Sequence, residues 1–324
     1  MNFELKRPGR SRFLQRPMNR RKLLHASALS TAGGLLLPGA SGAQESSLDL
    51  PPSQNTSTPS APIGARFNEG LLPDHRLIMY YGFPENPNMG ILGEYPPEQL
   101  LPQLLEQKAE YEAVINDRPW KAGFELIASV AQREPGPDGK YIADTDGKWL
   151  DMYTQFTEAN DMFLVLDVQM GLKTPKEDYE GLERWLRYDH VHLAIDPEFH
   201  VLPGETPGIE LGSIDAADVA EAQAWLLQLA EKYGTSRKML LIHQFNTYSV
   251  SNKDQIKPLE GVDLVLNMDG WGPPWQKLET WEVIIQQTPI EYNGVKVFYR
   301  QDEPIMTPAE VIALEPTPDV INYQ

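Results

Sequence analysis

The chain has 324 residues, with 28 basic and 46 acidic side chains, a formal net charge of −18 and no cysteine. This length allows one large domain or two ordinary ones. Without cysteine the chain can form no disulfide, no Cys-ligated metal site and no thiol nucleophile. The excess of acid argues against binding to nucleic acid or to an anionic lipid surface, because both require clustered positive charge.

The first 43 residues differ in charge from the rest of the chain. They hold eight basic residues and one acidic residue, whereas the remainder holds 20 basic and 45 acidic residues, a net charge of −25. The sequence NRRKLL at residues 19–24 resembles the twin-arginine export motif, and a weakly apolar stretch and small residues follow it. We therefore expect residues 1–43 to be a signal peptide read by the twin-arginine (Tat) machinery. Two pairs of alternatives stay open. Translation starts at Met1 or at Met18, and the signal peptide is either cleaved or kept as a membrane anchor.

Such a signal predicts export to the periplasm, the cell surface or the medium. Residues 44–72 follow it and are rich in Ser, Thr, Pro, Asn and Gln. That composition buries too little apolar surface to repay the entropy of folding. We expect a disordered linker at 44–72 and one folded domain at 73–324.

From residue 76 onward, short β-branched or aromatic runs alternate with longer segments of helical period. The expected strands are 76–82, 123–130, 163–168, 191–196, 239–245, 262–268, 295–300 and 319–323. The expected helices are 97–116, 148–160, 176–188, 215–233, 253–260, 275–287 and 307–314.

Eight such alternations predict an α/β protein with a (β/α)₈ TIM barrel. An open, doubly wound sheet is the alternative. The chain ends directly after the eighth strand, so the barrel would lack its final helix. We expect residues 63–75, or a partner, to cover the groove between the last strand and the first.

Polar side chains collect where the expected strands end. In a TIM barrel the active site lies at the carboxyl ends of the strands. We therefore expect a polar, mainly acidic pocket, with aromatic rings that stack on sugar faces. Its expected substrate-binding residues are Tyr80, Tyr81, Asp167, His243, Gln244, Asp269, Trp271 and Arg300.

The sharpest element of this pattern is the tripeptide Asp196-Pro197-Glu198 at the end of the fourth strand. Side chains alternate along a strand, so Asp196 and Glu198 share one face, whereas Val191, Leu193 and Ile195 share the other. Both carboxyl groups should then point into the barrel. Paired carboxyl groups of this kind suit glycoside hydrolysis, in which one acts as a proton donor and one stabilises a developing cation.

This Asp-x-Glu pair resembles that of glycoside-hydrolase barrels, namely chitinases and the Chalaropsis-type lysozymes. The likeness covers the tripeptide, the strand number and the barrel, and His192 and Ala194 stand where the chitinase pattern has further aspartates. The resemblance implies that Glu198 is the catalytic acid/base and that Asp196 assists it, with carbohydrate as the ligand.

Two alternatives use the same residues. Asp196, Glu198, His200 and His243 could together bind a metal ion and activate water, giving a metal-dependent hydrolase. The barrel could also bind an envelope glycan or another small polar ligand without catalysis, since fold alone does not fix function. The sequence contains no dinucleotide-binding or P-loop motif, so we expect no cofactor.

Overall fold

The computed structural model describes residues 69–324, and the expected signal peptide and most of the expected linker lie outside this range. Eight parallel strands form a closed ring, because β1 pairs with both β2 and β11. The predicted (β/α)₈ barrel is therefore confirmed. Its strands are β1 (Arg76–Gly82), β2 (Trp120–Ala131), β4 (Phe163–Val168), β5 (Val191–Ile195), β7 (Lys238–Gln244), β9 (Val262–Met268), β10 (Tyr292–Val297) and β11 (Val320–Tyr323).

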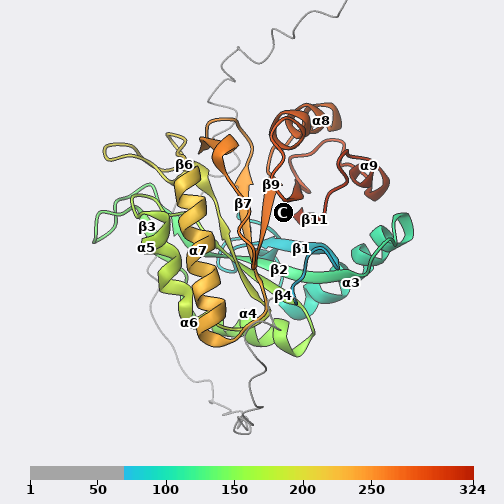
Figure 1. The fold of residues 1–324 in the computed structure, drawn as a ribbon, viewed down its shortest axis with the longest axis horizontal. Helices are drawn as coiled ribbons and strands as arrows, with labels where there is room; N and C mark the ends of the chain where they lie inside the picture. Colours follow the sequence, from blue (N-terminus) through green and yellow to red (C-terminus); the bar gives the residue numbers. More distant parts are fainter. Residues whose placement is uncertain (1–68) are drawn as a thin grey trace, which may run out of the picture.

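Helices surround this ring of strands (Figure 1). They are α3 (Pro97–Val114), α4 (Gly147–Ala159), α5 (Pro175–Tyr179), α6 (Glu183–Leu186), α7 (Ala216–Tyr233), α8 (Pro274–Trp281), which continues into the π-helical turn η6 (Glu282–Gln286), and α9 (Pro308–Ile312). Three short strands lie outside the ring. They are β3 (Ile142–Asp144), which is antiparallel to β2, and the pair β6 (Ile214–Asp215) and β8 (Val250–Ser251). Within residues 69–324, no helix is long and apolar enough to cross a membrane.

The ends of α7 illustrate how the sequence defines an element. The side chain of Asp215 accepts a hydrogen bond from the backbone N–H of Ala217 at 3.0 Å, and Asp218 accepts one from the N–H of Asp215 at 2.7 Å. These contacts satisfy N–H groups that have no partner inside the helix. Gly234 ends the helix with φ 65°, a conformation that glycine adopts without steric cost. The helix expected at 215–233 is thereby confirmed.

The helix expected at 253–260 was wrong, because only the 3₁₀ turn η5 (Lys253–Gln255) forms there. Asn252 precedes it in the left-handed region at φ 52°, and Pro258 cannot donate a helical hydrogen bond. Without a helix between β7 and β9, α7 contacts both of these strands. The barrel thus closes with one helix fewer than the alternation predicted.

Of residues 63–75, which were expected to cover the groove between the last strand and the first, residues 63–68 lie outside the described range and residues 69–75 do not lie in that groove. Tyr111 of α3 lies there instead, with its hydroxyl 2.7 Å from that of Tyr323 on β11. Leu72 is fully buried among side chains of the barrel interior, and its N–H donates to Asp263 at the start of β9. The segment therefore closes the N-terminal end of the barrel, and the folded unit includes Leu72, which the sequence analysis assigned to the linker.

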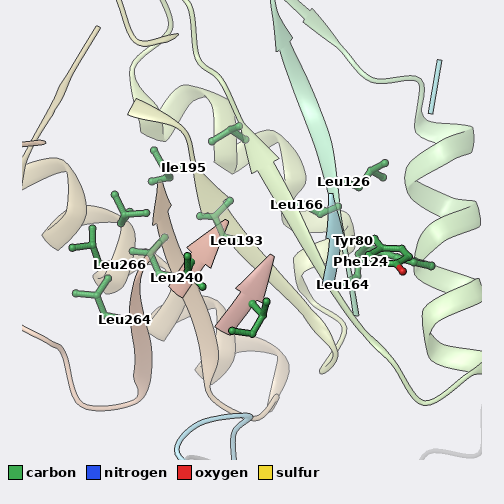
Figure 2. Close-up of a cluster of buried hydrophobic side chains, with 14 of the residues drawn as sticks. Tyr80, Phe124, Leu126, Leu164, Leu166, Leu193, Ile195, Leu240, Leu264 and Leu266 are labelled. Carbon is green, nitrogen blue, oxygen red and sulfur yellow. The ribbon is translucent and has the colours of Figure 1, made fainter. Parts of the chain in front are cut away.

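Apolar side chains form two main layers. The larger lies between the strands and the helices, and Figure 2 shows it with Leu164, Leu193 and Leu240 from neighbouring strands. The smaller fills the lower half of the barrel interior and includes Met79, Val165 and Leu241. The upper half, toward the carboxyl ends of the strands, is filled by polar side chains. We call this end of the barrel the mouth.

Candidate functional site at the mouth of the barrel

Each barrel strand, or the residue directly after it, contributes one inward polar side chain at the mouth, and each of these residues is at most 5% exposed. The alternation that places Met79, Val165 and Leu241 inside places the residue two positions further on inside as well. We call this set the polar layer. It consists of Tyr81, Glu125, Asp167, Asp196, His243, Asn267, Lys296 and Asn322.

His243 lies between two carboxylates. Its Nε2 is 2.7 Å from Oε1 of Glu125, and its Nδ1 is 2.8 Å from Oδ1 of Asp269, which follows β9. Burial alone would lower the pKa of His243, but the charges of Asp269 and Glu125 outweigh burial and raise the pKa well above its usual value. In metal-free protein the ring therefore carries a positive charge and donates to both neighbours.

Lys296 is the second cation of the site. Its Nζ is 3.2 Å from Oδ2 of Asp269 and 3.4 Å from the centre of the Tyr81 ring. Burial opposes the charge, but Asp269 and Glu125 raise the pKa of Lys296 above its usual value. A permanently protonated ammonium is a poor nucleophile, so Lys296 is suited to electrostatic stabilisation and not to Schiff-base chemistry.

The remaining polar groups orient the carboxylates. Asn322 donates through Nδ2 to Oε2 of Glu125, and the Tyr81 hydroxyl donates to Oδ2 of Asp167 at 3.1 Å. Asn267 donates through Nδ2 to Oδ1 of Asp269 at 2.6 Å. Glu125, Asp167 and Asp269 therefore each have at least one oxygen held by a buried donor.

The site holds more carboxyl groups than cations. Burial raises the pKa of Asp167 to about 6, and burial together with Asp269 raises that of Glu198 to about 7. Burial together with Glu198 raises the pKa of Asp196 well above its usual value. Burial would also raise the pKa of Asp269, but His243 and Lys296 lower it to about 2. The site thus combines one carboxylate that is ionised throughout the neutral range with carboxyl groups that keep their proton to a higher pH than usual.

Six of the residues selected from the sequence come together here. Asp167, Asp196, His243 and Asp269 occupy or touch the polar layer, and Glu198, half-buried in the turn after β5, interacts electrostatically with Asp196 and Asp269. Tyr81 joins them, with its hydroxyl bonded to Asp167 and its ring against Lys296. Trp271 is half-buried in the loop after β9.

Four other selected residues lie elsewhere. Tyr80 points to the opposite face of β1 and packs on Tyr299 and Tyr323. Gln244 donates to the backbone oxygen of Asn246 at 2.8 Å, and Arg300 is 62% exposed and paired with Glu94. His200 is half-buried and its Nδ1 is 2.7 Å from the backbone oxygen of Ser213. It therefore does not extend the polar layer.

Asn267 and Asn322, polar residues at the ends of expected strands, also belong to the site, whereas Glu125 and Lys296 complete it but were not selected from the sequence. The available signal was a charged residue in the middle of an otherwise apolar strand, as in Phe124-Glu125-Leu126 and Val295-Lys296-Val297. The strand expected at 295–300 actually spans 292–297, so its apparent end drew attention to Arg300. The inward cation is Lys296, four positions earlier.

One group of side chains also has metal-binding geometry. Among residues 69–324, Glu125, Asp167 and His243 each offer one ligand atom, and these atoms lie within 4.8 Å of one another. The set expected from sequence shares only His243 with this group.

No protein-family model matches the chain, and no curated protein matches it. Among solved structures, a ruminal GH26 endo-β-1,4-mannanase is similar, with a TM-score of 0.38 and 11% identity over 81% of this chain and 60% of the mannanase. The chain thus spans less than two thirds of the mannanase. A Burkholderia cenocepacia dihydropteroate synthase complexed with 7,8-dihydropteroate has a TM-score of 0.35 and 10% identity, over 78% of this chain and 86% of the synthase. Similarities this low say nothing about activity, so function has to be inferred from the site itself.

Proposed function

We propose that the chain is an exported glycoside hydrolase that cleaves its substrate at the mouth of the barrel. The proposal rests on the position of Glu198 and on the pKa of its carboxyl group. Its side chain is half-buried beside a buried layer of charges, and burial and Asp269 raise its pKa to about 7. A carboxylic acid that keeps its proton near neutral pH can protonate the leaving oxygen of a glycosidic bond.

A glycosidase also needs negative charge to stabilise the oxocarbenium-like transition state. Asp269 can supply it, because its two oxygens accept hydrogen bonds from Asn267 and Lys296 and its neighbour His243 is cationic. Among charged groups, Asp269 has the largest effect on Glu198, so the two interact strongly. The charge of the proposed anion, Asp269, therefore helps to keep the proposed acid, Glu198, protonated.

Asp196 takes the assisting role. Its pKa is raised well above the usual value by burial and by Glu198, so it retains its proton when Glu198 does. A protonated Asp196 can donate a hydrogen bond, which orients Glu198 or a substrate hydroxyl. It is less suited to act as a nucleophile, because nucleophilic attack requires the ionised form.

The loop after β9 supports carbohydrate as the substrate class. Trp271 is half-buried there, and Trp275 at the start of α8 is 61% exposed. Indole rings offer a flat apolar face to the C–H groups of a sugar while the polar layer accepts its hydroxyl groups. Among residues 69–324, the buried oxygen Oδ1 of Asn322 has no hydrogen-bond partner, and a hydroxyl group is a donor that could satisfy such an acceptor.

The decisive experiment compares wild type with Glu198→Gln on peptidoglycan, chitin and plant glycans, with release of reducing ends as the readout. We expect Glu198→Gln to lower turnover by about 100-fold or more, the usual contribution of a general acid. Affinity for the glycan and the thermal unfolding midpoint should change little. Glu210→Gln is the matched control, because Glu210 is an exposed carboxylate in the same loop.

Two outcomes would contradict the proposal. One is full activity of Glu198→Gln, which would remove Glu198 from the chemistry. The other is glycan binding by wild type without release of reducing ends, which would favour the non-catalytic binding protein.

A further inference from the structure

We propose that Glu125, Asp167 and His243 bind one divalent transition-metal ion, with Zn²⁺ preferred over Mn²⁺. The three residues come from β2, β4 and β7, and each is buried. One ligand atom of each lies within 4.8 Å of the others, close enough to surround a single ion after small rotations of the side chains. Two carboxylates and one imidazole are ligands that suit Zn²⁺, which binds more tightly than Mn²⁺ to such sets.

Each of the three side chains forms a hydrogen bond with a neighbouring side chain through the atom that points away from the proposed ion. Asn322 holds Oε2 of Glu125, and Tyr81 holds Oδ2 of Asp167 at 3.1 Å. Asp269 holds Nδ1 of His243 at 2.8 Å. A carboxylate that accepts the second ring N–H is the usual partner of a metal-bound histidine, because it fixes the tautomer and orients the ring. His243 follows this rule, and the carboxylates of Glu125 and Asp167 are each oriented by a buried hydrogen-bond donor.

On the side away from these neighbours, the ligand atoms contact one another or have no hydrogen-bond partner. Nε2 of His243 and Oε1 of Glu125 lie 2.7 Å apart and share one proton. Oδ1 of Asp167 is fully buried and has no hydrogen-bond partner. A buried acceptor without a partner costs free energy that a ligand would recover. This unpartnered oxygen is evidence for a bound species that is independent of the clustering of the three residues.

The neighbouring donors do not satisfy this oxygen. The Lys296 ammonium is engaged by Asp269 and by the ring of Tyr81. The Tyr81 hydroxyl donates to the other oxygen of Asp167. A cation held by the three residues would therefore contact an oxygen that the described side chains leave without a partner.

This inference goes beyond the proposed hydrolase, since it concerns three other residues and does not require that glycans are cleaved. It also differs from the metal set expected from sequence, because His200 lies against Ser213 and not in the polar layer.

The test uses tag-free full-length protein that has been treated with a chelator and dialysed. Isothermal titration with Zn²⁺, followed by elemental analysis after gel filtration, should give one ion per chain. Glu125→Gln and Asp167→Asn should weaken Zn²⁺ binding by more than the roughly 10- to 100-fold that is typical when a supporting residue is lost. Asn322→Ala, which leaves all three ligands in place, should weaken it within that range.

Glu198→Gln is the matched control, because it alters a carboxyl group of the same mouth outside the ligand set, and it should retain the ion. Its loss of turnover is read separately, so failure of the metal proposal and failure of the hydrolase proposal give different results. Co²⁺ provides a readout that does not depend on the stability of a variant, since its visible absorption in wild type should have the intensity of a low-coordinate nitrogen- and oxygen-ligated ion.

Three results would overturn the proposal. They are no stoichiometric Zn²⁺ in wild type, unchanged Zn²⁺ affinity in both Glu125→Gln and Asp167→Asn, and tighter binding of Ca²⁺ or Mg²⁺ than of Zn²⁺.

Discussion

The ammonium of Lys296 lies 3.4 Å from the centre of the Tyr81 ring, on the side of the barrel interior that faces the mouth. Both residues are nearly inaccessible to solvent, at 2% and 3% exposure. The contact places a cation over the negative face of a π-system in a region shielded from water, where such an interaction is strongest. Lys296 therefore connects the Tyr81 ring to the carboxylate of Asp269.

Replacing Lys296 by Met should destabilise the protein by about 3–5 kcal/mol, because it leaves the charge of Asp269 with less compensation. The measurement is the free energy of urea unfolding at pH 7. Lys148→Met is the control, since Lys148 is 60% exposed and its ion pairs lie at the surface, where solvent screens them. Equal losses for the two variants would contradict the role assigned to Lys296.

The proposed acid predicts the direction of the pH dependence. The pKa of Glu198 is raised to about 7, so the protonated form predominates below that pH and is lost above it. Turnover should therefore fall by about tenfold per pH unit above 7. The profile of kcat/KM between pH 5 and 9, measured with a chelator present, tests this. A rate that increases through this range would exclude Glu198 as the proton donor.

Gly294 on β10 provides a test of the architecture below the site. A Cβ atom at this position would lie 2.3 Å from Oδ1 of Asn267, whose amide nitrogen holds Asp269. Gly294→Ala should cost about 1–3 kcal/mol of stability through overpacking and lower activity by displacing Asn267. Gly181→Ala, where a Cβ meets nothing within 4 Å, should leave both unchanged within about 0.5 kcal/mol. Thermal unfolding and turnover of the two variants give the comparison.

Arg300 provides a prediction of no effect. Its guanidinium is 62% exposed and pairs with Glu94 at 2.7 Å, away from the polar layer. Arg300→Gln should therefore change the free energy of unfolding by less than about 1 kcal/mol and leave KM for the glycan unaltered. A large rise in KM would return Arg300 to the binding site, where the sequence pattern had placed it.

The barrel could be predicted from the sequence because its strands are buried and bounded by turn residues. Phe163–Val168 and Val262–Met268 have the bounds that the apolar runs indicated. The segment at 253–260 has helical composition, but Asn252 and Pro258 prevent continuous helical hydrogen bonding. The place of residues 69–75 could not be predicted, because a short apolar pair such as Leu71-Leu72 fits a groove or a barrel end equally well.

The site was predictable where polar residues end a strand and not where they interrupt one. Asp196 and Asp269 come directly after β5 and β9 and were found for that reason. Glu125 lies six residues before the end of β2, so only the phase of the strand shows that it points inward. The three-dimensional partners of His243 come from β2 and from the end of β9, which no local pattern can bring together.

The path of residues 69–75 determines how the protein should be handled. Because Leu72 lies at the N-terminal end of the barrel, whatever is fused to this side emerges on the face opposite the mouth. The last residue, Gln324, follows β11 and is hydrogen-bonded to Val297 and Tyr299 beside the mouth (Figure 1). An affinity handle or surface attachment placed before residue 69 would leave the mouth open to a polymeric substrate, whereas one attached at Gln324 would obstruct it.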